Sequence, residues 1–202
     1  MEVNTPIIIN GNAVVEKVWV DENTGKNCVV ALNTLGYRLG YVEINKRVPF
    51  DILNDEDVFL DNFVRVPYKD KISNVAILAN TLSKRRSTRV LDKCILVHGG
   101  VTFLGIKDVT SDISMRAIGF DCAHLFDTPD KESLANYFGK DSIQFNIVNK
   151  NCKEEGKIWS IEDTAEECES LARQVVSIEN KYLRMQKINR KKAWKEKRKS
   201  GR

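Results

Sequence analysis

The sequence has no apolar run of the roughly 18–20 residues that a membrane-spanning helix needs. Its first residues, MEVNTP, lack the basic region and the following apolar stretch of a secretory signal. We therefore expect no membrane partner and a cytoplasmic location. Hydrophobic residues make up 42% of the 202 positions and charged residues 30%, which is ordinary for a folded domain and argues against wholesale disorder.

Cysteine pairs of the C-x-x-C type are absent, and so are the P-loop and H-E-x-x-H motifs. The cysteines are an odd, scattered set, which gives no support to a zinc ribbon or a thioredoxin-like motif. In a reducing cytosol we expect them to be small, mostly buried apolar side chains without disulfides. Cys122 has no partner at a spacing that would make it a nucleophile. The five cysteines are residues 28, 94, 122, 152 and 168.

Net positive charge is confined to the last 22 residues. Residues 181–202 contain 11 Lys or Arg and one acid, Glu196, whereas residues 1–180 contain 21 basic and 27 acidic residues. The chain thus combines a mildly acidic domain with a basic tail. The tail could bind the phosphates of a nucleic acid, with Trp194 stacking on a base, or it could be only a solvated helix end.

β-Branched and alternating residues predict four strands, over residues 14–20, 28–33, 37–44 and 115–121. The loop between the first two strands carries Gly25, as expected for a hairpin. Residues 95–103 predict a further strand that is broken at Gly99 and Gly100.

Helices are expected after the strands. Pro129 and the acids beside it mark the start of one helix. Residues 160–163 resemble a capping box with Asp at the fourth position. Apolar residues then recur every three or four positions over 165–188, which predicts one long amphipathic helix reaching toward Lys197.

Together these elements predict an α+β fold, in which a mostly antiparallel sheet carries a long C-terminal amphipathic helix. We expect a single α+β domain over residues 1–180, with residues 51–92 as an insertion. Residues 181–202 then form a basic helical tail.

The first candidate chemical motif surrounds His98, in the string VHGGVTF over residues 97–103. A histidine followed by two glycines combines a titratable group with backbone N–H donors, here those of Gly99 and Gly100. Such donors could hold a phosphate or a developing oxyanion. In a regular strand His98 and Thr102 would share one face.

The second motif surrounds His124, the only other histidine, in the string GFDCAHLFD over residues 119–127. Asp121, His124 and Asp127 are three residues apart, so they would project to one side if the segment turned helically. The two histidines could act as general base and acid, with either carboxylate orienting an imidazole. They could instead hold a divalent metal, hydrogen-bond a ligand, or serve only the fold.

The residues around the two histidines resemble a known protein family. The strings GYV over 40–42, VHGGVTF over 97–103 and IGFDCAH over 118–124, followed by Asp127, resemble a family of small phage and prophage proteins. Members carry GYVG, VHGGLTF and GFDCAH-GD patterns in this order, followed by a C-terminal helix. The resemblance covers roughly residues 37–50 and 93–178.

This chain departs from the family pattern at several positions. Glu43 replaces the last small residue of the first string. Leu125 and Phe126 stand where a small residue and a glycine are usual. The paired tryptophans common before the third string are replaced by the residues at 115–117.

Most members of the family have no assigned function. Phage proteins of this size often counter host defence by binding or cleaving nucleotide signals such as cyclic dinucleotides or ADP-ribose derivatives, so the resemblance implies the same here by analogy. We expect a phage anti-defence protein, in the host cytoplasm, that hydrolyses a phosphodiester of a nucleotide immune messenger. The expected catalytic residues are His98, His124, Asp121 and Asp127, and the expected ligand contacts are Gly99, Gly100, Thr102 and Tyr41.

Two other classes remain open at this point. A non-catalytic sponge would sequester the nucleotide signal, as a homo-oligomer. An accessory protein would bind another protein, or a nucleic acid through the basic tail. The sequence identifies no cofactor, and none of the expected site residues is assigned as a metal ligand.

Overall fold

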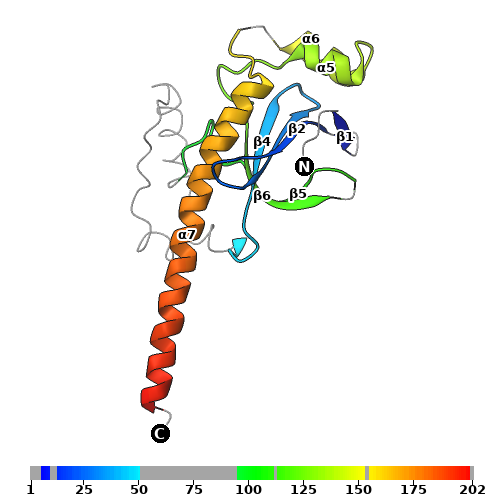
Figure 1. Ribbon diagram of the computed structural model, residues 1–202. Helices are drawn as coiled ribbons and strands as arrows, with labels where there is room; N and C mark the ends of the chain where they lie inside the picture. Colours follow the sequence, from blue (N-terminus) through cyan, green and yellow to red (C-terminus); the bar gives the residue numbers. More distant parts are fainter. Residues whose placement is uncertain (1–5, 10–12, 51–94, 112, 153–154, 201–202) are drawn as a thin grey trace.

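The structure, a computed structural model, describes residues 6–9, 13–50, 95–111, 113–152 and 155–200. Its sheet has six strands in the order β1-β2-β3-β4-β6-β5, and every neighbouring pair is antiparallel (Figure 1). The strands are β1 (Ile7–Ile9), β2 (Ala13–Val20), β3 (Asn27–Asn33), β4 (Arg38–Glu43), β5 (Phe103–Asp108) and β6 (Ser114–Asp121).

Three helices follow the sheet in the chain: α5 (Lys131–Phe138), α6 (Ile143–Asn151) and α7 (Ile161–Ser200). Asp130 caps α5 by accepting a hydrogen bond from the backbone N–H of Ser133. Ser160 and Asp163 form the expected capping box, because each side chain accepts a hydrogen bond from the other residue's backbone N–H. The α+β prediction is therefore confirmed.

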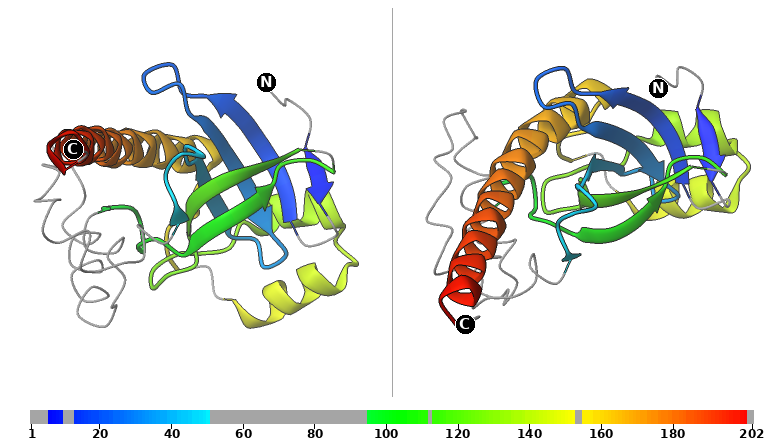
Figure 2. Two further views of the ribbon diagram at one scale, coloured as in Figure 1. Left: turned by 90° about the horizontal axis from the view of Figure 1, so that it is seen from below. Right: turned by 60° about the horizontal axis from the view of Figure 1, so that its bottom comes forward.

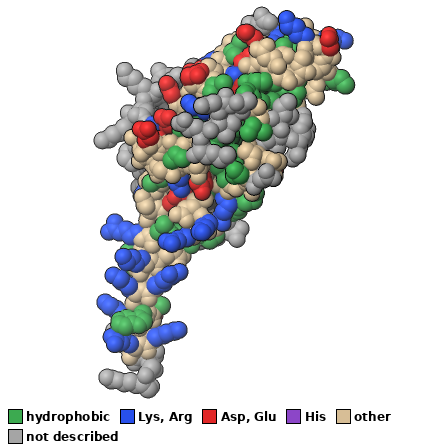
Figure 3. Space-filling model, turned by 45° about the vertical axis from the view of Figure 1, so that its right-hand side comes forward, with side chains coloured by type: hydrophobic (Ala, Val, Ile, Leu, Met, Phe, Trp, Pro, Cys, Tyr) green, Lys and Arg blue, Asp and Glu red, His purple; other side chains and the backbone are tan. Residues whose placement is uncertain are grey.

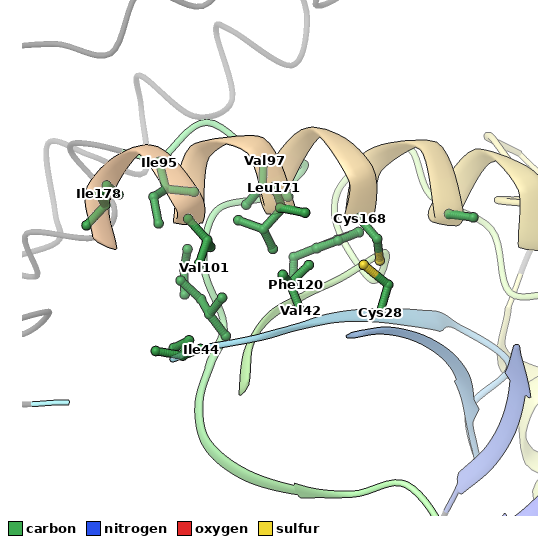
Figure 4. Close-up of a cluster of buried hydrophobic side chains, with 14 of the residues drawn as sticks. Cys28, Val42, Ile44, Ile95, Val97, Val101, Phe120, Cys168, Leu171 and Ile178 are labelled. Carbon is green, nitrogen blue, oxygen red and sulfur yellow. The ribbon is translucent and has the colours of Figure 1, made fainter. Parts of the chain in front are cut away.

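The main core lies between one face of the sheet and the first half of α7, which crosses β3 and β4 (Figure 2). The apolar positions of α7 recur every three or four residues, so they form one stripe that packs on the sheet. Figure 4 shows Ile95, Val97 and Val101 pointing into this core from the loop that runs beside α7. Three buried side chains thus anchor the loop that carries His98.

A second apolar cluster covers the opposite face of the sheet. It contains Val15 and Val18 of β2 together with Ala117 of β6 and, partly buried, Phe103 of β5. Strands β2 and β5 stand four positions apart in the sheet order, so the sheet must curl for them to share one cluster. The curled sheet encloses this cluster without help from α7.

Sequence and structure differ at three elements. Residues 95–102 form no strand, and β5 begins only at Phe103. Helix α6 and the short strand β1 were not predicted. The proposed insertion at residues 51–92 lies outside the described residues.

The second half of α7 leaves the sheet and projects from the domain (Figures 1 and 2). Every residue from Lys187 to Arg198 is exposed, whereas the core stripe ends with the partly buried Met185. At about 1.5 Å per residue, the 40 residues of α7 span about 60 Å. Among the helices that the structure describes, none has the length and apolar character to span a bilayer.

Candidate active site at the two histidines

Helix α7 holds the loop before the diglycine by two polar side chains. Gln174 accepts a hydrogen bond of 2.8 Å from Leu96 N and donates one of 2.7 Å to Leu96 O. Two turns earlier on the same helix, Glu167 accepts a bond of 2.7 Å from His98 N. Burial raises the pKa of Glu167, and this hydrogen bond acts against that rise. The backbone groups of the loop thus form their hydrogen bonds with side chains of a helix, whereas those of a strand would form them with a neighbouring strand.

A tight turn follows His98. The backbone N–H of Gly100 donates to Val97 O at 3.0 Å, and both glycines have positive φ, 65° at Gly99 and 92° at Gly100. The first of these positions is the third of the turn, where glycine is favoured. Because Gly100 N–H is used in the turn, it is available to a phosphate only if the turn opens.

Gly99 has a second, steric role. The imidazole of His124 packs directly on the Gly99 backbone, and a Cβ built at Gly99 would overlap that ring. The two strings are therefore in contact, and the ring centroids of His98 and His124 lie 5.3 Å apart. The sequence prediction placed these histidines in one site, and the structure brings them together.

Asp127 joins the two motifs. Its backbone N–H donates to His124 O at 2.9 Å, which closes a turn, and its Oδ2 accepts from His124 N at 2.9 Å. The same Oδ2 lies 2.7 Å from His98 Nε2, and Oδ1 accepts from Trp159 Nε1 at 2.9 Å. Burial alone would raise the pKa of Asp127, but these hydrogen bonds together bring it below its usual range. The group is therefore a carboxylate at neutral pH.

The Asp127 carboxylate determines the tautomer of His98. Since a carboxylate can only accept, His98 Nε2 must carry the proton, and Nδ1 of the neutral ring is then the acceptor. Trp159 packs beside this imidazole with a centroid distance of 4.3 Å. The arrangement is that of an oriented general base, in which one ring nitrogen is held and the other is left to take a proton.

His124 is held less tightly than His98. Its Nε2 lies 3.4 Å from Asp121 Oδ1, within ion-pair range but without hydrogen-bond geometry. The His124 side chain is 29% exposed, whereas that of His98 is 18% exposed. Asp127 thus orients the His98 ring by a hydrogen bond, whereas Asp121 lies within ion-pair range of His124.

Arg38 of β4 fixes the position of the Trp159 backbone. Its guanidinium donates to Trp159 O, to both oxygens of Glu16 at 2.8 and 2.9 Å, and to Asp130 at 2.8 Å. These partners come from β2, from the cap of α5 and from the segment that leads into α7. A fully paired buried cation therefore connects the sheet to the wall of the site.

One expected ligand contact, Tyr41, lies apart from the histidines. Tyr41 belongs to the cluster on the opposite face of the sheet, where it is 6% exposed and meets the Phe103 ring edge-on at 5.2 Å. Thr102 is exposed, and its backbone N–H donates to Gly119 O at 3.0 Å. Cys122 is buried, and burial raises the pKa of its thiol, which opposes a role as nucleophile.

Three residues of the site were not predicted from the sequence: Trp159, Glu167 and Gln174. A signal existed for two of them. Glu167 and Gln174 continue the three- and four-residue spacing of the core stripe through Leu171 and Ile178, so they are polar residues at core positions. No local pattern marks Trp159, because its partner Asp127 is 32 residues away.

The turn between His124 and Asp127 carries backbone strain. Phe126 has φ 76°, and it is the only non-glycine residue with positive φ in the part of the chain that the structure describes. We expect Phe126→Gly to raise the melting temperature by about 1–4 °C. Relief of about 1–2 kcal/mol of left-handed strain exceeds the cost of glycine flexibility of about 0.5–1 kcal/mol. Thermal unfolding measures this directly.

The matched control is the neighbouring residue Leu125, which is 82% exposed and does not have a positive φ. Leu125→Gly adds the same chain flexibility without relieving strain, so it should lower the melting temperature. Equal decreases in the two variants would contradict the strain at Phe126.

No cluster of three or more His, Cys, Asp or Glu side chains within the described ranges is arranged to hold a metal ion. The four described cysteines, residues 28, 122, 152 and 168, are free thiols. No protein-family model matches the chain, and neither does any curated protein or solved structure. The likeness to the phage family therefore rests on the three sequence strings.

Proposed function

We propose that the chain is a phage anti-defence protein that hydrolyses a phosphodiester bond of a nucleotide immune signal. One observation carries the proposal: His98 is oriented by the ionised Asp127, and the ring centroid of His124 lies 5.3 Å from that of His98. A purely structural histidine needs one satisfied hydrogen bond, whereas two adjacent imidazoles with separate carboxylates suit proton transfer in both directions.

The proposed reaction uses water as the nucleophile. Nδ1 of His98 takes a proton from the water as its oxygen bonds to phosphorus, and Asp127 stabilises the imidazolium that forms. His124 gives a proton to the ester oxygen as the phosphorus–oxygen bond breaks. His98 thus gains one proton and His124 loses one. Asp121 Oδ1, 3.4 Å from His124 Nε2, is close enough to stabilise the protonated form of His124 before this step.

Exposed apolar side chains beside the site suit a nucleobase. Leu125 and Phe126, 82% and 67% exposed, stand between His124 and Asp127 in the chain. Ile158 is 51% exposed and stands in the chain between Lys157 and Trp159. Lys157 pairs with Asp127 in an isolated β-bridge, so this segment borders the site. Exposed apolar residues around a polar centre are typical of a ligand site.

The experiment is incubation with a panel of cyclic nucleotides and cyclic ADP-ribose isomers, followed by chromatography before and after heat denaturation. The parent should convert one member into a new product with many turnovers. His98→Gln should leave that member unconverted, and Ile188→Ala, on the remote exposed part of α7, should behave like the parent.

Each other outcome has a distinct meaning. Release of intact ligand on heating, without product, would replace hydrolysis by sequestration. If no member of the panel is depleted in either sample, the nucleotide-signal function is wrong.

A further inference from the structure

The exposed end of α7 has a composition that the fold does not require. We define the basic arm as residues 181–200 of α7. Residues 181–202 contain 11 Lys or Arg and one acid, so pairing within this segment cannot neutralise the charge. Figure 3 shows the Lys and Arg side chains gathered along the projecting helix, away from the domain.

Like charges line one face of the arm. Lys187, Lys191 and Lys195 are four residues apart, so successive ammonium groups stand one above another along the helix. Each such pair destabilises an isolated helix by about 0.2–0.5 kcal/mol, and the exposed arm has no core to offset this cost. A bound polyanion would remove the repulsion and stabilise the helix.

The arm also borders a hollow of about 810 Å³. Four of its eight described lining residues are basic and none is acidic, and one of the basic residues, Arg47, comes from the domain. The described lining is Arg47, Tyr182, Leu183, Gln186, Lys187, Arg190, Lys191 and Trp194. A cationic concave surface of this kind can follow a phosphate backbone rather than meet it at one point.

Trp194 gives the hollow an aromatic surface. The residue is 56% exposed, and the guanidinium of Arg198 lies 4.2 Å from its ring centroid, over one face of the ring. Cations interleaved with an aromatic ring are the usual chemistry of sites for unpaired bases, because every base can stack on the ring.

We propose that the basic arm and its hollow bind single-stranded nucleic acid. The phosphates would contact Lys187, Arg190 and Lys191, and one base would stack on the face of Trp194 that Arg198 leaves uncovered. Glu167, beside His98, and Trp194 are 27 residues apart on one helix, which is about 40 Å. The arm site is therefore separate from the histidine site and does not depend on the proposed hydrolysis.

The test is fluorescence anisotropy of labelled 20-nucleotide single strands and of the matching duplex, with the full chain and a range of salt concentrations. The single strands should bind more tightly than the duplex, and Trp194→Ala should weaken single-strand binding about tenfold or more. Ile188→Ala is the matched control, since Ile188 is an exposed apolar residue of the same arm outside the hollow, and it should bind like the parent.

The contribution of the cations is measured separately. The double variant Lys187→Gln/Lys191→Gln should reduce the slope of log Kobs against log salt by about 1.4, because each phosphate contact on a single strand contributes about 0.7. Polyglutamate of similar length serves as a competing acidic polypeptide. The proposal is overturned if polyglutamate competes as well as a single strand, if Trp194→Ala has no effect, or if no strand binds at low salt.

Discussion

The proposed hydrolysis of a nucleotide signal should fall by about 10²–10⁴ when either histidine of the site is replaced, in His98→Gln or in His124→Ala. The first change removes the proposed base, whose Nε2 is held 2.7 Å from Asp127, and the second removes the proposed acid, His124, next to it. The double variant should lose little more than either single variant, because paired acid and base act as one unit. Single-turnover rates measured by chromatography give these ratios.

The pH profile distinguishes an acid–base pair from a pair of binding residues. Histidine is the side chain whose charge changes between about pH 5 and 8, so two histidines acting as base and acid give a bell-shaped profile of kcat/KM. His98→Gln should lose the acidic limb, because the base that must be unprotonated is gone. A bell-shaped profile that persists unchanged in both single variants would show that groups other than the two histidines determine the pH dependence.

Stability measurements separate catalysis from folding in these variants. His98→Gln keeps an amide donor for Asp127, so the melting temperature should fall by no more than about 4 °C. Asp127→Asn should cost more, because a buried carboxylate that receives three donors is replaced by a group with a donor of its own. A large loss of stability in His98→Gln, with the rate of the folded fraction unchanged, would assign the histidine a structural role.

The elements that the sequence predicted are those whose signals are local. The capping box at Ser160 and Asp163 is made by residues three apart, and the stripe on α7 follows the helical period. The strands β2, β3, β4 and β6 likewise carry apolar residues, several of them β-branched, that pack on one or the other face of the sheet. Helix α6 has only one buried residue, Val148, so it lacks the apolar stripe that would have predicted it.

Residues 95–102 show why the remainder could not be predicted. The apolar residues Ile95, Val97 and Val101 alternate as in a strand and are buried as a strand would be. The hydrogen bonds of the segment, however, join His98 N to Glu167 and Leu96 N to Gln174, which are 69 and 78 residues away. No local pattern distinguishes a segment paired to a helix side chain from one paired to a neighbouring strand.

The sequence predicted the candidate site only in part, because residue types are visible in a sequence whereas the face of the sheet that a residue takes is not. The order of the strings and the residue types indicated both histidines and Asp127, because glycines and titratable groups are visible in the sequence. Tyr41 was grouped with them by the family pattern, yet its position on β4 directs it to the other face of the sheet. Which face a strand residue takes depends on the register of the sheet, and the sequence does not contain that information locally.

Gly99→Ala should damage both folding and chemistry, and its effect on stability should be the largest of the changes considered. The residue has φ 65°, which costs an alanine about 1–2 kcal/mol, and the added Cβ would overlap the His124 ring. Overlap with a packed group adds about 1–3 kcal/mol. The sum, about 2–5 kcal/mol, corresponds to a fall in melting temperature of about 4–20 °C. The folded fraction should also lose activity, because His124 is displaced from His98.

The steric part of this effect can be isolated with two further variants. Gly25 has φ 68°, and a Cβ added there would meet nothing within 4 Å, so Gly25→Ala carries the backbone cost alone. The difference between the two alanine variants is therefore the cost of the overlap with His124. Adding His124→Ala to Gly99→Ala should recover that difference, since the double variant has no ring to overlap. If Gly99→Ala costs no more than Gly25→Ala, or if His124→Ala recovers nothing, then the contact between the two strings is not the one described, and the shared site loses its geometric basis.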